Sequence, residues 1–308
     1  MTVKLRRSEL AVPASNPKMI AKAAGAGADL VFLDLEDAVA PDQKVAARRN
    51  VIDALGSLDW GSTMRCVRIN GVHTCWAVDD LIEVVSRTGQ HLDVVMVPKV
   101  RSRRDIWFVE TLLDHLERKQ GLDRPIGIEV LIEEAEALAN VEKIAAASPR
   151  LQALILGFGD LSASLGMRAT RLNYSGDVWH YARTRVIAAA RAHGIDPIDG
   201  PYPAVKDPEG YRAEAISAAA LGSVGKWCLH PGQIPIANEV FAPSPEELAE
   251  ALTALDAIAA AARAGEGAAM HNGMMIDAAV ARNFETTVRR AHACGVSAED
   301  AVTAGSPR

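Results

Sequence analysis

The stretch IGIEVLIEEAEALANVEKIAAASPRLQALILGFGDL, residues 126–161, decides the fold. It contains two apolar runs of strand length, at 126–134 and 153–160, and a helical pattern at 135–147 between them. A strand, a helix and a second strand in this order predict a parallel βαβ unit with both strands buried on two faces. Glu133 ends the first predicted strand and Asp160 ends the second, so two acids are expected at successive strand ends.

The same alternation of strand and helix continues along residues 8–231. Eight strands are predicted, at 8–15, 29–37, 65–70, 93–100, 126–134, 153–160, 195–202 and 224–231. Helical patterns lie between them, at 17–26, 42–55, 78–88, 102–119, 135–147, 178–193 and 208–221. Eight such units favour an α/β protein of the (β/α)8 TIM-barrel type over an open doubly wound sheet, which has fewer strands and a glycine-rich first turn.

The pattern changes after Pro231. A helix is predicted over 244–265, and the glycine-rich stretch GEGAAMHNG (265–273) separates it from a last helix at about 277–294. No strand is expected in this tail. We therefore divide the chain into a catalytic TIM-barrel domain, residues 1–240, and a C-terminal helical extension or lid, residues 241–308.

Composition and charge narrow the class of protein. The chain has 308 residues, 49% of them hydrophobic, and a formal net charge of -6, which argues against a general nucleic-acid binder. Its four cysteines have no metal-like spacing and do not form a disulfide framework. No apolar run approaches the roughly 20 residues that span a bilayer, and the N-terminus has no apolar signal region. We expect a reduced, cytoplasmic protein that acts on small molecules, with no membrane partner.

Charged residues gather at the predicted strand ends, which in a barrel meet at one mouth. These residues are Ser15, Glu36, Asp37, Arg68, Asn70, Lys99, Glu133, Asp160, Asp199, Lys226 and His230. Four of these carboxylates, those of Glu36, Asp37, Glu133 and Asp160, would repel each other in one mouth unless a cation or basic side chains neutralise them. Glu133 and Asp160, one βα unit apart, are candidate metal ligands. Two carboxylate ligands favour Mg2+, which keeps water and substrate oxygens in its other positions, and Mn2+ also fits.

The basic residues of the mouth have competing interpretations. Arg68 is interpreted as a ligand for a substrate carboxylate, because guanidinium binds carboxylates in a bidentate way, and an ion pair with Glu36 is the alternative. Lys99 fits an anion site and an ion pair at the edge of the core equally well. His230 is interpreted as a structural hydrogen-bonding group, because no second His or Cys lies at ligand spacing.

Ordered motifs between residues 7 and 291 match those of a known enzyme family. They are DLVFLDLEDAVAPDQKVAAR, VRING, VPKV, the 126–161 stretch, IDGPY, GKWCLHPGQI and ANEVFAPS. Together they resemble the citrate lyase beta-subunit family of the HpcH/HpaI aldolase superfamily, and most closely its malyl-CoA lyase branch. The resemblance implies a Mg2+-dependent barrel that cleaves or forms the bond between an acyl-CoA α-carbon and an α-keto acid such as glyoxylate or pyruvate.

The resemblance also implies residue roles. Glu133 and Asp160 fall on the metal ligands, Glu36 and Asp37 on acids that hold metal-bound waters, and Arg68 on the arginine that binds the keto acid.

Substrate binding is expected to involve Arg68, Glu133 and Lys22, with Lys22 facing CoA. The family's aromatic and arginine residues are missing from the first turn, where Ala11 and Asn16 lie instead. In the malyl-CoA lyase branch an aspartate from an adjacent subunit completes the site, and that position is Asp277. An N-cap of the last helix is the alternative role for Asp277.

The function expected is therefore cleavage of a malyl-CoA, methylmalyl-CoA or citramalyl-CoA type ester by a homotrimer or hexamer. Three alternatives stay open: a malyl-CoA-type thioesterase, a metal-dependent aldolase on free hydroxy-keto acids, and a non-catalytic subunit that keeps the fold.

Overall fold

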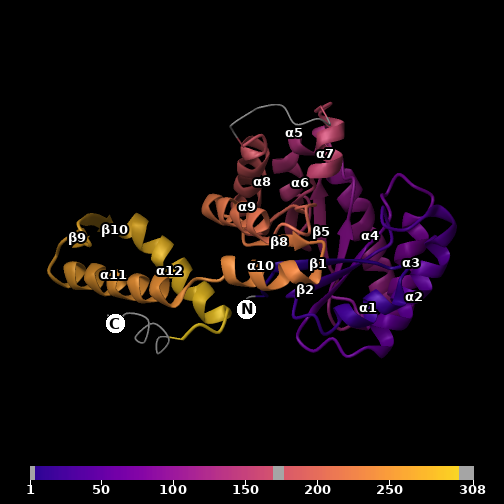
Figure 1. Ribbon diagram of the computed structural model, residues 1–308, viewed down its shortest axis with the longest axis horizontal. Coiled ribbons are helices and arrows are strands. Elements are labelled where there is room, and N and C mark those ends of the chain that lie inside the picture. Colours follow the sequence, from indigo (N-terminus) through magenta and orange to yellow (C-terminus); the bar gives the residue numbers. More distant parts are fainter. Residues whose placement is uncertain (1–3, 169–176, 298–308) are drawn as a thin grey trace. The chain divides into compact units, whose positions relative to one another are not determined.

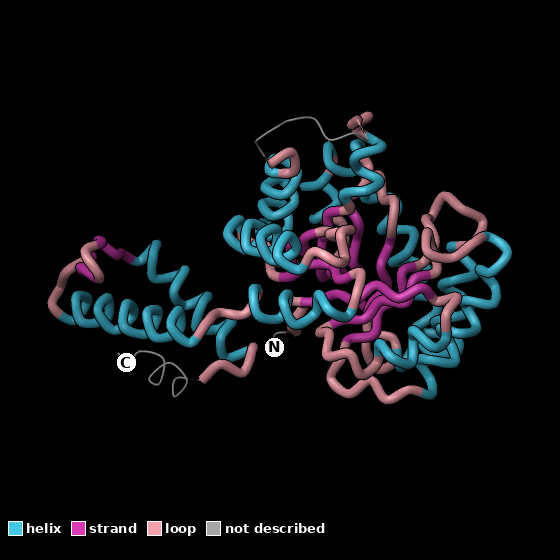
Figure 2. The backbone as a smooth tube through the Cα atoms, in the orientation of Figure 1, coloured by secondary structure: helices cyan, strands magenta, loops and turns pink. Residues whose placement is uncertain are grey.

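Eight parallel strands form a closed barrel in which each strand pairs with the next in the chain and β8 pairs with β1 (Figures 1 and 2). The structure is a computed structural model that describes residues 4–168 and 177–297. The strands are β1 (Ser8–Pro13), β2 (Leu30–Asp34), β3 (Met64–Arg68), β4 (Val94–Val97), β5 (Gly127–Ile132), β6 (Leu151–Leu156), β7 (Asp196–Asp199) and β8 (Gly225–Cys228). The predicted TIM-barrel fold is confirmed.

Helices surround the strands, as Figure 2 shows. They are α1 (Pro17–Ala23), α2 (Lys44–Ser57), α3 (Ala77–Thr88), α4 (Arg103–Gln120), α5 (Ala135–Ala139), α6 (Val141–Ala145), α7 (Phe158–Ser164), α8 (His180–Ala192), α9 (Pro208–Leu221) and α10 (Ile234–Val240). Short 3-10 turns are η1 (Pro41–Gln43), η2 (Gly89–His91) and η3 (Pro231–Gln233). Two predictions were wrong in detail. The helix predicted at 135–147 breaks at Asn140, and the last residues of the strand predicted at 153–160 begin α7.

Strand residues of one parity fill the barrel interior, because side chains alternate between the two faces of a strand. The buried cluster consists of Leu30, Phe32, Met64, Cys66, Val94, Met96, Leu131, Ala153, Ile155, Ile198 and Trp227. The next residue of the same parity is Asp34 after Phe32, Arg68 after Cys66 and Glu133 after Leu131. The interior packing therefore carries three charged side chains into the mouth at the C-terminal ends of the strands.

The C-terminal unit, residues 239–308, is distinct from the barrel unit, residues 6–238, and residues 298–308 of the predicted extension lie outside the described residues. It contains α11 (Pro245–Arg263), β9 (Ala268–His271), β10 (Met274–Asp277) and α12 (Ala278–Ala293). The expectation that this tail has no strand was wrong. β9 and β10 pair antiparallel around Asn272 and Gly273, whose φ angles of 48° and 78° suit a tight hairpin turn.

No helix in the described part of the chain is long and apolar enough to cross a membrane.

Candidate active site

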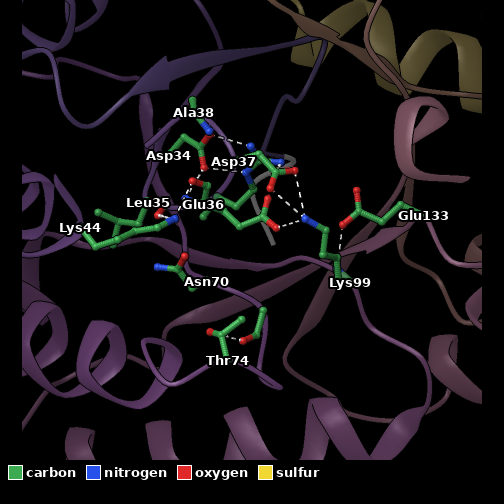
Figure 3. A network of polar contacts seen from close by, with 12 residues as sticks. Asp34, Leu35, Glu36, Asp37, Ala38, Lys44, Asn70, Thr74, Lys99 and Glu133 are labelled. Carbon is green, nitrogen blue, oxygen red and sulfur yellow. Dashed lines mark hydrogen bonds and ion pairs between the residues drawn. The ribbon is translucent and has the colours of Figure 1, made fainter. Parts of the chain in front are cut away.

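The mouth of the barrel contains acids and cations from β2, from β3 and from the segments after β4 and β5, joined by hydrogen bonds and ion pairs. Figure 3 shows the part of this set around Glu36, Asp37 and Lys99. Asp34 and Arg68 are register partners on β2 and β3. The Arg68 Nε donates to Asp34 Oδ1 at 2.7 Å, and Nη2 donates to Asp34 Oδ2 at 2.6 Å. This bidentate pair is buried and fixes the orientation of the guanidinium.

The Arg68 guanidinium lies over the top of the barrel core. Its Cζ is 5.8 Å from the centroid of the Phe32 ring and 5.5 Å from that of Trp227. Burial lowers its pKa, but the charge and hydrogen bonds of Asp34 outweigh burial and the pKa is raised, so the cation is permanent. Because Asp34 occupies the edge formed by Nε and Nη2, a substrate carboxylate would have to use the edge that includes Nη1. Glu36 Oε2 lies 3.3 Å from Nη1, so the ion-pair alternative for Arg68 is present as well.

The segment after β2 is held by two buried side chains. Asp34 accepts hydrogen bonds from the amides of Glu36 at 2.8 Å and Ala38 at 3.1 Å. The Lys44 ammonium donates to the carbonyl of Leu35 at 2.8 Å and to that of Glu36 at 2.7 Å. This segment is therefore fixed from both sides, which sets the direction of the Glu36 and Asp37 side chains (Figure 3).

Lys99 joins this segment to the end of β5. Its ammonium contacts Glu36 and lies 2.9 and 3.0 Å from the two carboxylate oxygens of Asp37. Of the two interpretations left open for Lys99, the ion pair is confirmed. Burial raises the pKa of Asp37, but the hydrogen bond and charge of Lys99 outweigh it and lower that pKa. The pKa of the more deeply buried Glu36 is raised by burial, in spite of Arg68 and Lys99.

Glu133 is the most strongly perturbed acid of the mouth. Burial raises its pKa to about 8, against the opposing effects of the Lys99 amide and the Arg68 charge, while Glu36 and Asp160 add to the increase. Its Oε1 accepts a hydrogen bond from the Lys99 amide at 2.7 Å. Gly157 packs against Glu133 so closely that a Cβ at position 157 would lie 2.6 Å from the Glu133 Cβ.

Asp160 does not end a strand, which corrects the prediction. It lies half-buried in the first turn of α7, four residues beyond the end of β6. Gly157 separates strand from helix there, because its missing side chain makes room for Glu133. The turn still brings Asp160 near enough to Glu133 for their charges to interact.

The donor set is compatible with a hard divalent cation. Glu133 and Asp160 offer carboxylate oxygens only, and an acid whose pKa is raised by burial and neighbouring acids gains most from a nearby cation. Among the described residues, no three His, Cys, Asp or Glu side chains come together in a way that could hold a metal ion. A cation here would therefore have two protein carboxylates and complete its shell with water or substrate oxygens, as Mg2+ does. The ligand assignment remains a prediction.

Four predicted mouth residues are engaged elsewhere. Lys226 and Asp199 have the opposite parity to Trp227 and Ile198, so they lie outside the barrel wall in a buried ion pair of 2.5 Å. Arg183 of α8 forms a second ion pair with Asp199.

Asn70 and His230 have structural roles. The Asn70 side chain donates to Asp80 at 2.7 Å. The Nδ1 atom of His230 accepts a hydrogen bond from the Gly232 amide at 3.0 Å, which confirms the structural interpretation of His230.

Lys22 and Asp277 were predicted from the resemblance, and their roles stay predictions. Lys22 is exposed in the last turn of α1, a helix whose N-cap is Asn16. Asp277 belongs to the C-terminal unit, where its Oδ1 accepts hydrogen bonds from the amides of Ala279 at 2.9 Å and Val280 at 3.1 Å. These hydrogen bonds lower its pKa. The N-cap alternative for Asp277 is therefore present in the structure.

Sequence reasoning missed Asp34 and Lys44. Asp34 could have been found by parity, because it follows Leu30 and Phe32 at intervals of two in a buried strand. Lys44 could not, because a lysine at the start of a surface helix gives no sign that its ammonium turns inward to backbone carbonyls.

Comparison with known proteins agrees with this geometry. The family model described as HpcH/HpaI aldolase/citrate lyase matches residues 7–231. The chain belongs to this family. The family resemblance and the expected enzyme class, a carbon–carbon lyase, are thereby confirmed.

Three HpcH/HpaI relatives bear on the activity. An L-malyl-CoA/beta-methylmalyl-CoA lyase of Cereibacter sphaeroides is 44% identical over 299 residues, which cover 92% of this chain and 94% of that protein. A (3S)-malyl-CoA thioesterase of the same organism is 36% identical over 271 residues, covering 88% and 89%. The crystal structure of protein CitE from Mycobacterium tuberculosis in complex with magnesium, acetoacetate and coenzyme A has a TM-score of 0.75 and 34% identity, covering 95% of this chain and all of that one.

Proposed function

We propose that the chain is a Mg2+-dependent CoA-ester carbon–carbon lyase. Its substrate would be a malyl-CoA, methylmalyl-CoA or citramalyl-CoA type ester, and its products a short acyl-CoA and glyoxylate or pyruvate. The observation that supports this best is the arrangement of acids around the buried Glu133, which interacts with the half-buried Asp160 and with an Arg68 guanidinium that Asp34 fixes in place. Mn2+ would also suit these oxygen donors.

The reaction breaks the bond between the α-carbon of the thioester and the carbon that carries the hydroxyl group. The hydroxyl proton leaves, its oxygen becomes the keto oxygen, and the bonding electrons pass to the thioester as an enolate that takes up a proton. Glu133 and Asp160 would hold the metal, which when bound supplies a Lewis acid for the oxygens of the keto acid. Arg68 would orient the carboxylate of the departing keto acid and stabilise charge on its oxygens.

The proton transfer is proposed for Asp277. Its lowered pKa keeps it ionised, so it could accept a proton in one direction of the reaction and return it in the other. We further propose that it acts from an adjacent subunit of a homotrimer or hexamer, that Lys22 contacts CoA, and that the enzyme is cytoplasmic.

A panel of hydroxyacyl-CoA esters tests the proposal. The purified full chain is incubated with Mg2+ and each ester, and the keto acid and acyl-CoA are measured separately. Release of the two in equal amounts from at least one ester is expected. No keto acid from any ester, with Mg2+ bound to the protein, would contradict the proposal.

A thioesterase is the second candidate, and the 36% identity to a (3S)-malyl-CoA thioesterase favours keeping it. Hydrolysis also needs a polarised carbonyl, in this case that of the thioester, so the acids and the arginine of the mouth are compatible with both reactions. Products separate them: free malate and free CoA indicate hydrolysis, whereas glyoxylate and acetyl-CoA indicate cleavage.

A further inference from the structure

Lys99 has a backbone conformation that lysine rarely adopts. Its φ angle is 51°, and the other described non-glycine residue with a positive φ is Asn272, in the hairpin turn of the C-terminal unit. A side chain makes the left-handed region unfavourable, and glycine is the residue that usually occupies it. Such strain persists where surrounding contacts over-determine it, often at functional sites.

The backbone of Lys99 is held by the acid at the end of β5. Its amide donates to Glu133 Oε1 at 2.7 Å, one of the shortest backbone contacts of the mouth. The residue with the left-handed conformation is thus also the one whose amide donates to the buried carboxylate of Glu133. This contact depends on the main chain, so it is available to any residue that tolerates the φ angle at position 99.

The side chain of Lys99 is held by the acids that follow β2. The ammonium contacts Glu36 and both carboxylate oxygens of Asp37, and Figure 3 shows it between these two acids. Asp37 is half exposed, with 55% of its side chain accessible, so few neighbours pack against it. Its ion pair with Lys99 is therefore the main contact that holds its carboxylate in place. Lys99 therefore connects acids from two different strands through two different parts of one residue.

We propose that Lys99 is a positioning residue whose ammonium is the cation held permanently among the acids Glu36, Asp37 and Glu133, called here the acid cluster. Its ammonium holds Glu36 and Asp37 in place, and its positive charge weakens the binding of a divalent cation beside Glu133. This inference rests on the proposed function, because Glu36 and Asp37 matter for turnover only if the mouth is the active site.

The two effects of the ammonium have opposite signs, which makes the inference testable. Removing the charge removes repulsion toward a divalent cation, whereas the direct contact from the amide to Glu133 remains. Removing the side chain also frees Glu36 and Asp37, whose carboxylates then repel each other. Metal binding should therefore tighten while turnover falls. A residue with a purely structural role would weaken both.

The experiment compares Lys99→Met with the wild-type full chain, and with Lys119→Met as a control that removes an exposed lysine of α4. Mg2+ affinity is measured by calorimetry, and kcat and KM are measured at saturating Mg2+. In Lys99→Met we expect Mg2+ affinity to rise on the order of tenfold, the effect of one solvent-screened charge near a divalent ion. We expect kcat to fall by about 100-fold, as for misplaced catalytic groups. Lys119→Met should change neither.

Lys99→Arg keeps the charge and should retain wild-type Mg2+ affinity. If Lys99→Met does not fold, Lys99→Gly takes its place, because glycine suits the φ angle of 51°. Unchanged or weaker Mg2+ affinity without the ammonium, or a wild-type kcat, overturns the inference. If the wild-type protein binds Mg2+ but cleaves no ester, the proposed function fails and the affinity comparison still decides the role of Lys99. A wild-type protein that binds no Mg2+ contradicts both.

Discussion

Asp34 and Arg68 lie opposite each other on β2 and β3, and both oxygens of Asp34 accept hydrogen bonds from the Arg68 guanidinium, at 2.7 and 2.6 Å. The same carboxylate accepts hydrogen bonds from the backbone amides of Glu36 and Ala38. One acid thus orients the arginine and shapes the segment that carries Glu36 and Asp37.

Asp34→Asn should leave Arg68 as a buried cation without its bidentate partner, with Glu36 at 3.3 Å as the carboxylate that remains. We expect the free energy of unfolding to fall by about 3 kcal/mol, the cost of breaking a buried ion pair. We expect kcat/KM to fall by about 100-fold, because the guanidinium is no longer fixed. Denaturant unfolding and steady-state kinetics measure the two effects.

Asp29→Asn is the matched control for this prediction. Asp29 precedes β2 and pairs with Arg7 through two contacts of 2.8 Å, so the same chemistry occurs at the opposite end of the same strand. This variant should lose stability and keep its kcat. Equal losses of kcat in both variants would mean that the effect of Asp34→Asn comes from the barrel as a whole.

Gly157→Ala tests the packing that positions Glu133. A Cβ at position 157 would lie 2.6 Å from the Glu133 Cβ and 2.8 Å from its Oε2, so the carboxylate must move. We expect Mg2+ affinity to fall by 10- to 100-fold, the usual effect of disturbing the support of a metal ligand. Gly159→Ala is the control, because a Cβ there meets nothing within 4 Å. Calorimetric titration with Mg2+ compares the two variants. Equal affinities would show that the packing of Gly157 against Glu133 does not affect metal binding.

Asp277 has a capping role in the structure and a proposed catalytic role, and two substitutions separate them. Asn caps helices as well as Asp, whereas Ala costs about 1 kcal/mol at an N-cap. Asp277→Asn should therefore keep the stability of the wild type and lose at least about 100-fold in kcat, the contribution of a general acid or base. Asp277→Ala should lose both. An Asp277→Asn variant with wild-type kcat would leave Asp277 with capping alone.

Glu9 predicts a pH dependence of stability. It is fully buried, in β1 at the end of the barrel opposite the mouth. Burial raises its pKa well above the usual value, and the charges of Glu129 and Asp196 raise it further, whereas the charge of Arg6 lowers it. The folded chain therefore keeps a proton that the unfolded chain releases. Stability falls as pH rises above the ordinary glutamate pKa, until the raised pKa is reached.

Glu9→Gln should remove this loss, because the amide stays neutral. Its advantage in the free energy of unfolding should grow with pH, by up to about 1.4 kcal/mol for each pH unit. Urea unfolding at pH 5.5 and pH 8 measures it, with Glu209→Gln on the exposed start of α9 as the control. An advantage that is the same at both pH values would show that Glu9 is ionised in the folded protein.

The barrel could be predicted from the sequence because strands that are buried on two faces, such as β2, β4 and β6, appear as apolar runs at regular intervals between helical patterns. The hairpin of the C-terminal unit was missed although Asn272 and Gly273 form a strong turn signal, because the flanking strands AAMH and MMID are short and do not alternate.

The site was predicted in part. Arg68, Glu36, Asp37 and Glu133 come together as expected, because Arg68 ends a strand of the barrel and the three acids closely follow the ends of two others. Lys226 and Asp199 were wrongly assigned to the mouth, because only their position at a strand end was considered. Side chains alternate between the two faces of a strand, and these two lie on the outer face, beside α8. The contacts of Lys44 and Lys99 depend on the path of the main chain after β2 and β4, which no residue pattern reveals.

Keto-acid release shows whether the acids beside Arg68 are the site of metal-dependent carbon–carbon cleavage. Keto acid formed from a malyl-CoA type ester is followed with Mg2+, with a chelator in place of Mg2+, and with Glu133→Gln. We expect keto acid and acyl-CoA in equal amounts from the wild type with Mg2+, and at least about 100-fold less in the other two cases. Undiminished keto-acid release by Glu133→Gln, or free hydroxy acid as the wild-type product, would contradict this expectation.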